Sequence, residues 1–141
     1  MLSEGNGMYK KIMVALSLEH GIAERALQAA HILADKDAEV IAVHVHEPLQ
    51  GSVKFHVSDE DIERSKKQTR ALLAERTTNH PEVKSVILEG HAGRTLSDYA
   101  ATIGADCIIV ASHKPGLRDY LLGSTAARTV RHAPCSVHVL R

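Results

Sequence analysis

The sequence is poor in aromatic residues: it has no tryptophan, one phenylalanine and three tyrosines, which make up 3% of its 141 residues. So few rings offer little surface on which nucleic-acid bases or a flavin could stack. The formal net charge is zero, and the basic residues between positions 64 and 70 follow acidic residues at 60, 61 and 63. Nucleic-acid binding needs a clustered basic surface, so we expect no nucleic-acid partner.

The sequence also lacks segments that would direct it to a membrane or out of the cell. No apolar run reaches the roughly 18 residues of a membrane span, and residues 1–7 lack the charged and apolar regions of a secretory signal. We expect residues 1–7 to be a loose leader before a single domain at 8–141. Cys107 and Cys135 lie inside apolar runs. This placement favours thiols in a reducing cytoplasm over a disulfide framework.

Five apolar runs alternate with longer segments of helical character. The run at 107–111 is continuously apolar, which is typical of a strand covered on both faces in a parallel sheet. The predicted strands span residues 12–17, 40–46, 83–89, 107–112 and 136–140.

The intervals between these strands carry helix signals. Apolar residues recur at helical spacing from Ala23 to Leu33. The next helix should open at the capping-box arrangement 58–61 and be exposed, because its apolar stripe is thin. That stripe consists of Ile62, Thr69 and Leu72.

A third helix is predicted to open with a second capping-box arrangement at 95–98, and a fourth at or just before Ser124, running towards His132. This order predicts an α/β fold: an open, doubly wound, Rossmann-like domain with a five-stranded parallel sheet of strand order 3-2-1-4-5. Such sheets bind ligands at the carboxyl ends of the strands, where the strand order reverses. The rule selects the loops after Ser17, His46 and Ser112.

The loop after residue 112 leads to Gly123-Ser124-Thr125 at the start of a helix. Unpaired backbone N–H groups and the positive end of the helix dipole favour a phosphate there. Gly123 would let the backbone approach an anion, and Ser124 and Thr125 add hydroxyl donors. The alternative is that Ser124 caps its helix and Gly123 turns the chain without any ligand.

Several segments, in order along the chain, together resemble the universal stress protein family. They are residues 9–15 (YKKIMVA), 39–45 (EVIAVHV), 105–113 (ADCIIVASH), 121–128 (LLGSTAAR) and 130–137 (VRHAPCSV). The resemblance covers residues 8–141. It implies a stress-response protein that binds an adenine nucleotide and acts by binding and dimerisation rather than by fast catalysis.

Nucleotide-binding members of that family carry the pattern Gly-x2-Gly-x9-Gly-Ser/Thr after the fourth strand. Here Ala111 and Lys114 stand at the first two glycine positions, and eight residues precede Gly123, which makes the Ser-His-Lys-Pro turn one residue shorter. Lys114 could supply a cation to the phosphates, or Gly116 could take over the missing turn conformation. The retained Gly123 and Ser124 favour the nucleotide-binding branch.

The resemblance implies ATP as the bound ligand. Val45 matches the position whose backbone meets the adenine edge. Ser17 replaces the Asp that usually faces the ribose, and this leaves Mg²⁺ or Mn²⁺ coordination uncertain. The nucleotide-binding residues expected are Ala15, Leu16, Ser17, Val45, Ala111, Ser112, His113, Lys114, Gly116, Gly123, Ser124 and Thr125.

A second hypothesis is a nucleotide-independent, dimeric interaction module of the same fold. The last strand, Ser136–Leu140, would be an unprotected sheet edge. In the family this strand pairs across a homodimer, so we expect a dimer under either hypothesis. The sequence names no protein partner and no inducing stress.

We expect no catalytic residues and no metal ligands. The ten histidines are scattered, without a cysteine or carboxylate at a recognisable ligand spacing. His44 and His113 are expected to be hydrogen-bonded at strand ends. The Gly-x4-Gly-Lys-Ser/Thr loop of fast nucleotide hydrolases is missing, and so is the Gly-x-Ser-x-Gly elbow that a nucleophilic Ser112 would need. Only slow ATP hydrolysis is left open.

Overall fold

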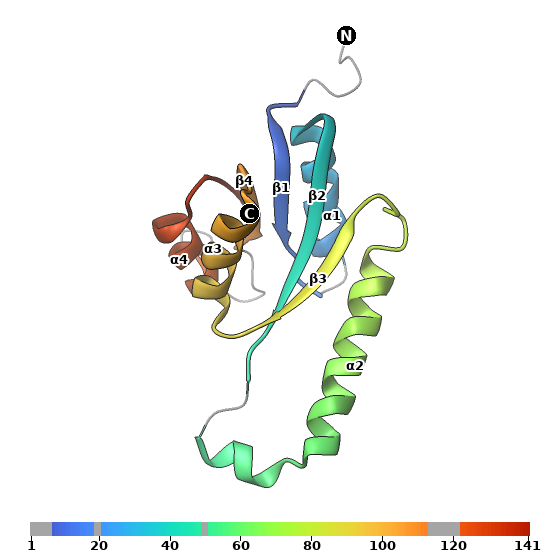
Figure 1. Cartoon of the computed structure of the whole chain (residues 1–141), viewed down its shortest axis with the longest axis vertical. Coiled ribbons are helices and arrows are strands. Elements are labelled where there is room, and N and C mark those ends of the chain that lie inside the picture. The colour runs from blue at the N-terminus through green and yellow to red at the C-terminus, as the bar shows by residue number, and fades with distance from the viewer. Residues whose placement is uncertain (1–6, 19–20, 49–50, 113–121) are drawn as a thin grey trace.

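The computed structural model describes residues 7–18, 21–48, 51–112 and 122–141. Within them, five parallel strands form one sheet in the order β3-β2-β1-β4-β5, which confirms the predicted fold class (Figure 1). The strands are β1 (Tyr9–Ala15), β2 (Ala34–His46), β3 (Lys84–Glu89), β4 (Cys107–Ala111) and β5 (Ser136–Leu140). The helices are α1 (Ile22–Leu33), the 3-10 helix η1 (Gly51–His56), α2 (Asp59–Arg76), α3 (Ala92–Ile103) and α4 (Ser124–His132).

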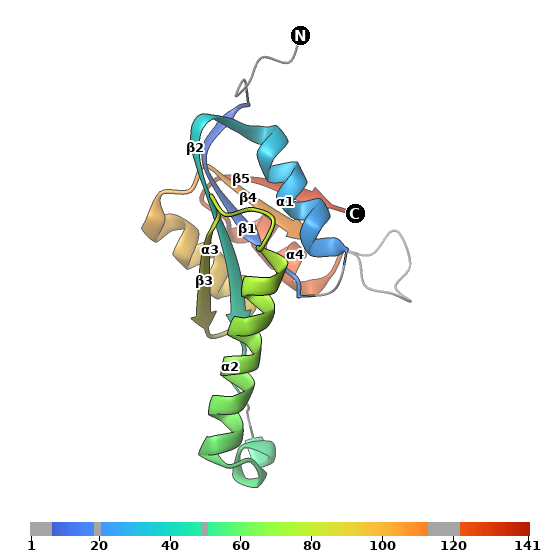
Figure 2. The ribbon, with the colours of Figure 1, turned by 90° about the vertical axis from the view of Figure 1, so that its right-hand side faces the viewer.

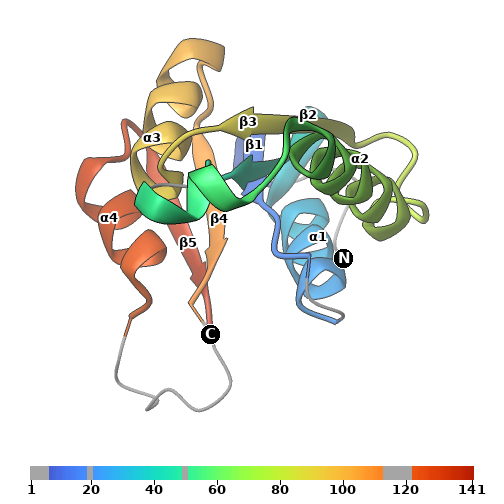
Figure 3. The same cartoon turned by 90° about the horizontal axis from the view of Figure 1, so that it is seen from below.

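Helices cover both faces of the sheet (Figures 2 and 3). On one face, α1 packs Leu27 against Ile12 and Val14 of β1. On the other, α3 and α4 pack against Met13 of β1 and Ile108 of β4. Successive side chains of a strand point to opposite faces, so a central strand must be apolar at every position. This requirement explains the continuous apolar runs in the sequence.

The aspartate that precedes β4 holds the start of β1 in register. The Asp106 carboxylate accepts hydrogen bonds from the N–H groups of Lys10 (2.8 Å) and Lys11 (2.9 Å). Its own N–H donates to the carbonyl of Lys11 at 2.9 Å. These bonds place Ile12 opposite Cys107 and fix the two central strands against each other.

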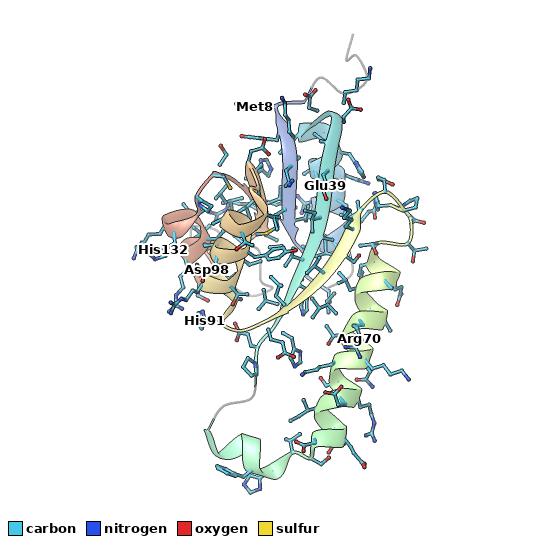
Figure 4. All side chains as sticks on the ribbon, in the orientation of Figure 1. Met8, Glu39, Arg70, His91, Asp98 and His132 are labelled. Carbon is cyan, nitrogen blue, oxygen red and sulfur yellow. The ribbon has the colours of Figure 1, made fainter. Side chains whose placement is uncertain are left out.

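Helix α2 begins at the predicted cap, where Ser58 Oγ accepts a hydrogen bond from the N–H of Asp61 at 3.1 Å. It extends beyond the sheet, with η1 at its far end (Figures 1 and 2). Most of its side chains are exposed, among them Arg70 (Figure 4). The predicted exposure is confirmed, but the predicted apolar stripe is wrong by one position, because Leu73 is the buried residue and Leu72 is exposed.

Some predicted boundaries are wrong. β2 begins at Ala34 rather than at residue 40, because Ala34 already pairs with Tyr9 of β1; an irregularity separates this pair from the next one, Lys11 with Glu39. α3 begins at Ala92, ahead of the predicted capping box at 95–98. Its first N–H donates to the Glu47 carboxylate at 3.1 Å. This cap comes from a residue far away in the sequence, which no local pattern can indicate.

Both cysteines carry free thiols. Cys107 is fully buried in β4, and burial raises the pKa of its thiol to about 11. Burial also raises the pKa of Cys135. In the described part of the chain, no helix has both the length and the apolar character needed to cross a membrane.

Candidate functional site

A pocket of about 230 Å³ lies at the carboxyl ends of β1, β2 and β4, where the strand order reverses. All of the predicted nucleotide-binding residues that the structure describes line it. They are Ala15, Leu16, Ser17, Val45, Ala111, Ser112, Gly123, Ser124 and Thr125. The other predicted residues, His113, Lys114 and Gly116, lie outside the described residues.

Helix α4 begins at the edge of this pocket. Gly123 is its N-cap residue, and its carbonyl accepts the N–H of Ala127 at 2.8 Å. Glycine has no side chain with which to cap the first turn, and no other described side chain is hydrogen-bonded to its N–H groups. The N–H groups of that turn therefore have no capping acceptor from a described side chain, at the positive end of the helix dipole.

The backbone of Gly123 does not require a glycine. Its φ of −55° and ψ of 154° are accessible to any residue. Among the described atoms, a Cβ at this position would meet only the carbonyl oxygen of Ser112, at 3.8 Å, which is an ordinary contact. The missing side chain instead keeps space open in front of α4, on the wall of the pocket.

A hydrogen-bonded turn after β1 forms the opposite wall. The Leu16 N–H donates to the carbonyl of Val43 at 2.8 Å, and Nδ1–H of His44 donates to the Leu16 carbonyl at 3.2 Å. Farther out, Nε of Arg76 donates to the carbonyl of Leu18 at 3.0 Å. These bonds hold the backbone on both sides of Ser17, and they confirm that His44 is a hydrogen-bonded strand-end residue.

Val45 directs its backbone polar groups towards the pocket side of β2. The bond from Leu16 N–H shows that the Val43 carbonyl faces β1. The backbone groups of successive residues in a parallel strand face alternate sides, and Val45 is two residues after Val43. The N–H and C=O of Val45 therefore face the same side as those of Val43. β1 ends at Ala15, opposite Val43. The N–H and C=O of Val45 therefore lie beyond the end of β1, beside the pocket.

The sequence patterns missed the helical part of the wall. The additional lining residues are Ile22, Val43, His44, Ala92, Leu96, Val110 and Ala126. Those of α3 reach the pocket because Glu47 caps the start of that helix next to β2. His91, labelled in Figure 4, immediately precedes this start. The one sequence signal for Ala92 was its position three residues after the end of β3, just beyond Gly90.

The described wall of the pocket carries no charged side chain. Among its described lining residues there is no Asp, Glu, Lys or Arg. A divalent cation would therefore find hydroxyl and carbonyl oxygens there but no described carboxylate, and hard cations such as Mg²⁺ prefer at least one. The geometry suits an uncharged, flat group inside and an anion at the start of α4.

An open, doubly wound α/β domain with a helix start at the switch point of the sheet defines the Rossmann-like class of folds. Within this class, residues 8–141 match the model of the universal stress protein family. The chain therefore belongs to the universal stress protein family of stress-response proteins.

Curated relatives agree with this assignment over nearly the whole chain. Universal stress protein A homolog 2 of Coxiella burnetii is 30% identical over 142 residues, covering 94% of this chain and 95% of the relative. Universal stress protein G of Shigella flexneri is 26% identical over 143 residues, covering 95% of this chain and 100% of the relative.

Solved structures show the same fold at low sequence identity. A universal stress protein in complex with cAMP is 17% identical with a TM-score of 0.69, over 94% of this chain and 97% of that chain. The universal stress protein from Archaeoglobus fulgidus in complex with dAMP is 22% identical with a TM-score of 0.61, over 94% of this chain and 98% of that chain. A family member from Arabidopsis thaliana with AMP bound is 18% identical with a TM-score of 0.61, over 93% of this chain and 90% of that chain.

Proposed function

We propose that this protein binds ATP or a related adenine nucleotide in the pocket between β1 and α4. The observation that carries the proposal is the start of α4. No described side chain caps its N–H groups, and Gly123 leaves space in front of them at the switch point of the sheet. An anion placed there gains charge-assisted hydrogen bonds and the favourable end of the helix dipole. The phosphates occupy this position, with the hydroxyls of Ser124 and Thr125 as further donors.

The nucleoside occupies the apolar inside of the pocket. About 230 Å³ is below the roughly 300–1,000 Å³ of complete small-molecule sites, so the pocket takes the base and sugar while the phosphates lie at its mouth. The backbone N–H and C=O of Val45 offer one donor and one acceptor to the edge of a base. Structures of the same fold with cAMP, dAMP and AMP support adenine as that base.

Binding, not turnover, is the proposed activity. The described lining residues include no carboxylate that could hold a catalytic Mg²⁺ or orient an attacking water. We propose that nucleotide occupancy changes the surface that the protein offers to a partner protein. Hydrogen exchange with and without ATP tests this step, because identical exchange outside the pocket would contradict it.

Titration of the full chain with AMP, ADP and ATP, each with and without Mg²⁺, tests the ligand. We expect saturable binding of at least one of these nucleotides, and little gain from Mg²⁺, since the described pocket wall holds no carboxylate. GTP serves as the control for base recognition by Val45. Absence of binding at millimolar ATP would exclude the proposal and favour the nucleotide-independent interaction module.

We also propose that the protein forms a homodimer through β5. Among the described strands, β5 pairs only with β4 and lies at the end of the sheet. The Leu140 carbonyl faces β4, because it accepts the Ser112 N–H at 3.0 Å. By alternation, the backbone groups of Val137 and Val139 face the outer edge, where a second copy could pair with them. The free thiols Cys107 and Cys135 favour a cytoplasmic location for this dimer.

A further inference from the structure

A cluster of potential metal ligands lies outside the pocket, where the last turn of α1 meets the loop between α2 and β3. Nε2 of His31 lies 2.9 Å from Nδ1 of His80 and 2.9 Å from Oε1 of Glu82. Nδ1 of His80 and Oε1 of Glu82 are 3.9 Å apart. One nitrogen or oxygen from each of the three side chains thus lies within 4.8 Å of the other two.

These separations match the coordination sphere of a transition metal. A tetrahedral ion with bonds of about 2.0–2.1 Å holds its ligand atoms about 3.3 Å apart. The three measured separations, 2.9, 2.9 and 3.9 Å, lie on both sides of that value. A small rotation of the exposed Glu82 side chain would equalise its separations from the two histidines, while the 2.9 Å between the two imidazole nitrogens has to lengthen as the ion binds. Two imidazoles and one carboxylate suit Zn²⁺ and its neighbours in the transition series rather than Mg²⁺ or Ca²⁺.

A second carboxylate orients the buried histidine of the cluster. Glu24, in the first turn of α1, lies 3.0 and 3.1 Å from Nε2 of His80 through its two oxygens. Nε2–H of His80 therefore donates to Glu24, and the lone pair of Nδ1 faces His31 and Glu82. Histidines that bind metals usually have such a carboxylate on the other ring nitrogen, because it fixes the tautomer and makes the ligand more basic.

The loop that carries His80 is itself rigidly bonded. The His80 N–H donates to the carbonyl of Thr77 at 2.9 Å, and the Val83 N–H donates to the carbonyl of His80 at 3.0 Å. The His80 side chain is only 10% exposed, whereas that of Glu82 is 55% exposed. A cavity of about 280 Å³, lined in part by His31, Asp35 and Glu82, adjoins the open side. It leaves room for water as a fourth ligand.

We propose that His31, His80 and Glu82 form a binding site for a divalent transition-metal ion, with Zn²⁺ as the expected occupant and Glu24 as a positioning residue for His80. The ion would connect the end of α1 to the loop between α2 and β3. Both imidazoles must offer a lone pair, so the ion takes the place of the proton that lies between His31 and His80 in the metal-free cluster. The site is independent of the nucleotide pocket.

Zinc binding to the chelator-treated full chain tests the proposal, by calorimetry and by metal analysis after dialysis. We expect one equivalent of Zn²⁺, and a rise of the melting temperature with zinc concentration because the ion binds only the folded state. H31A and E82Q should each weaken binding at least tenfold. E24Q should weaken it by about 10- to 100-fold, the usual effect of removing such an orienting partner.

A matched control separates this site from the other histidines of the chain. His132 lies on α4, across the sheet from α1 (Figure 4), and H132A should bind one equivalent with unchanged affinity. Co²⁺ in place of zinc should give the strong visible absorption of a four-coordinate site, lost in E82Q. Circular dichroism verifies that each variant is folded. If H31A does not fold, E82Q still tests the site, because Glu82 is exposed. Zinc binding that is absent, or equal in H31A, E82Q and H132A, would overturn the proposal.

Discussion

We predict that Gly123→Ala leaves the stability of the protein almost unchanged while it weakens ATP binding by about 10- to 100-fold. Within the described part of the chain the new Cβ meets only the Ser112 carbonyl at 3.8 Å, and φ of −55° suits alanine. Reduced freedom of the unfolded chain would stabilise the variant by about 0.4–1 kcal/mol. The poorer N-cap propensity of alanine offsets this by a similar amount. The net change should stay within about 0.5 kcal/mol.

The loss of affinity follows from the space that the methyl group would occupy. It lies on the pocket wall in front of α4, so a phosphate has to move away from the helix start. Losing one hydrogen bond to a charged oxygen costs about 1.5–3 kcal/mol, which is about 10- to 100-fold in affinity. Gly123→Val, with two more methyl groups, should weaken binding further.

Gly104 provides the matched control. It has φ of +70° at the end of α3, and a Cβ there would meet no atom within 4 Å. Gly104→Ala should therefore cost about 1 kcal/mol through backbone strain alone and leave ATP binding unchanged. Urea denaturation without nucleotide and ATP titration measure both quantities for both variants. If Gly123→Val binds ATP as tightly as the parent, the phosphates do not lie at the start of α4.

Two further predictions concern β4 and β5. Burial raises the pKa of the Cys107 thiol to about 11 in the folded protein, above its value in the unfolded chain. The stability that comes from this difference in pKa is therefore fully present below about pH 9. Up to about 2–3 kcal/mol of the free energy of unfolding should be lost as the pH rises towards 11. Urea denaturation at each pH measures this loss, and Cys107→Ala should lack the part that the thiol contributes. An equal decrease of unfolding free energy with pH in both proteins would contradict the prediction. Val139→Pro removes an N–H that faces the outer edge of β5 and keeps the pairing with β4, so it should convert a dimer to a monomer in size-exclusion chromatography. A parent protein that is already monomeric at high concentration would exclude the β5 dimer.

Local sequence patterns predicted the elements that local forces decide. The run at 107–111 had to be a covered strand because every one of its side chains is apolar, and the Ser58 cap marked the start of α2 because its bond to Asp61 spans three residues. The rule that ligands bind at strand ends then selected the loops after Ser17, His46 and Ser112, and the structure brings Ser17 and Ser112 to one pocket with Gly123. Their role in nucleotide binding stays a prediction.

The sequence by itself determined the order of strands and helices, the two-sided core and the helix start at Gly123, because these depend on neighbours within a few positions. Only the tertiary structure decided which distant residues meet. It brought Glu47 to the start of α3, and it assembled His31, His80 and Glu82 from segments that no spacing rule connects. These residues meet because α1 and α2 pack on one face of the sheet, which brings the ends of both helices together. Contacts between residues so far apart in the sequence produce no periodic pattern in it.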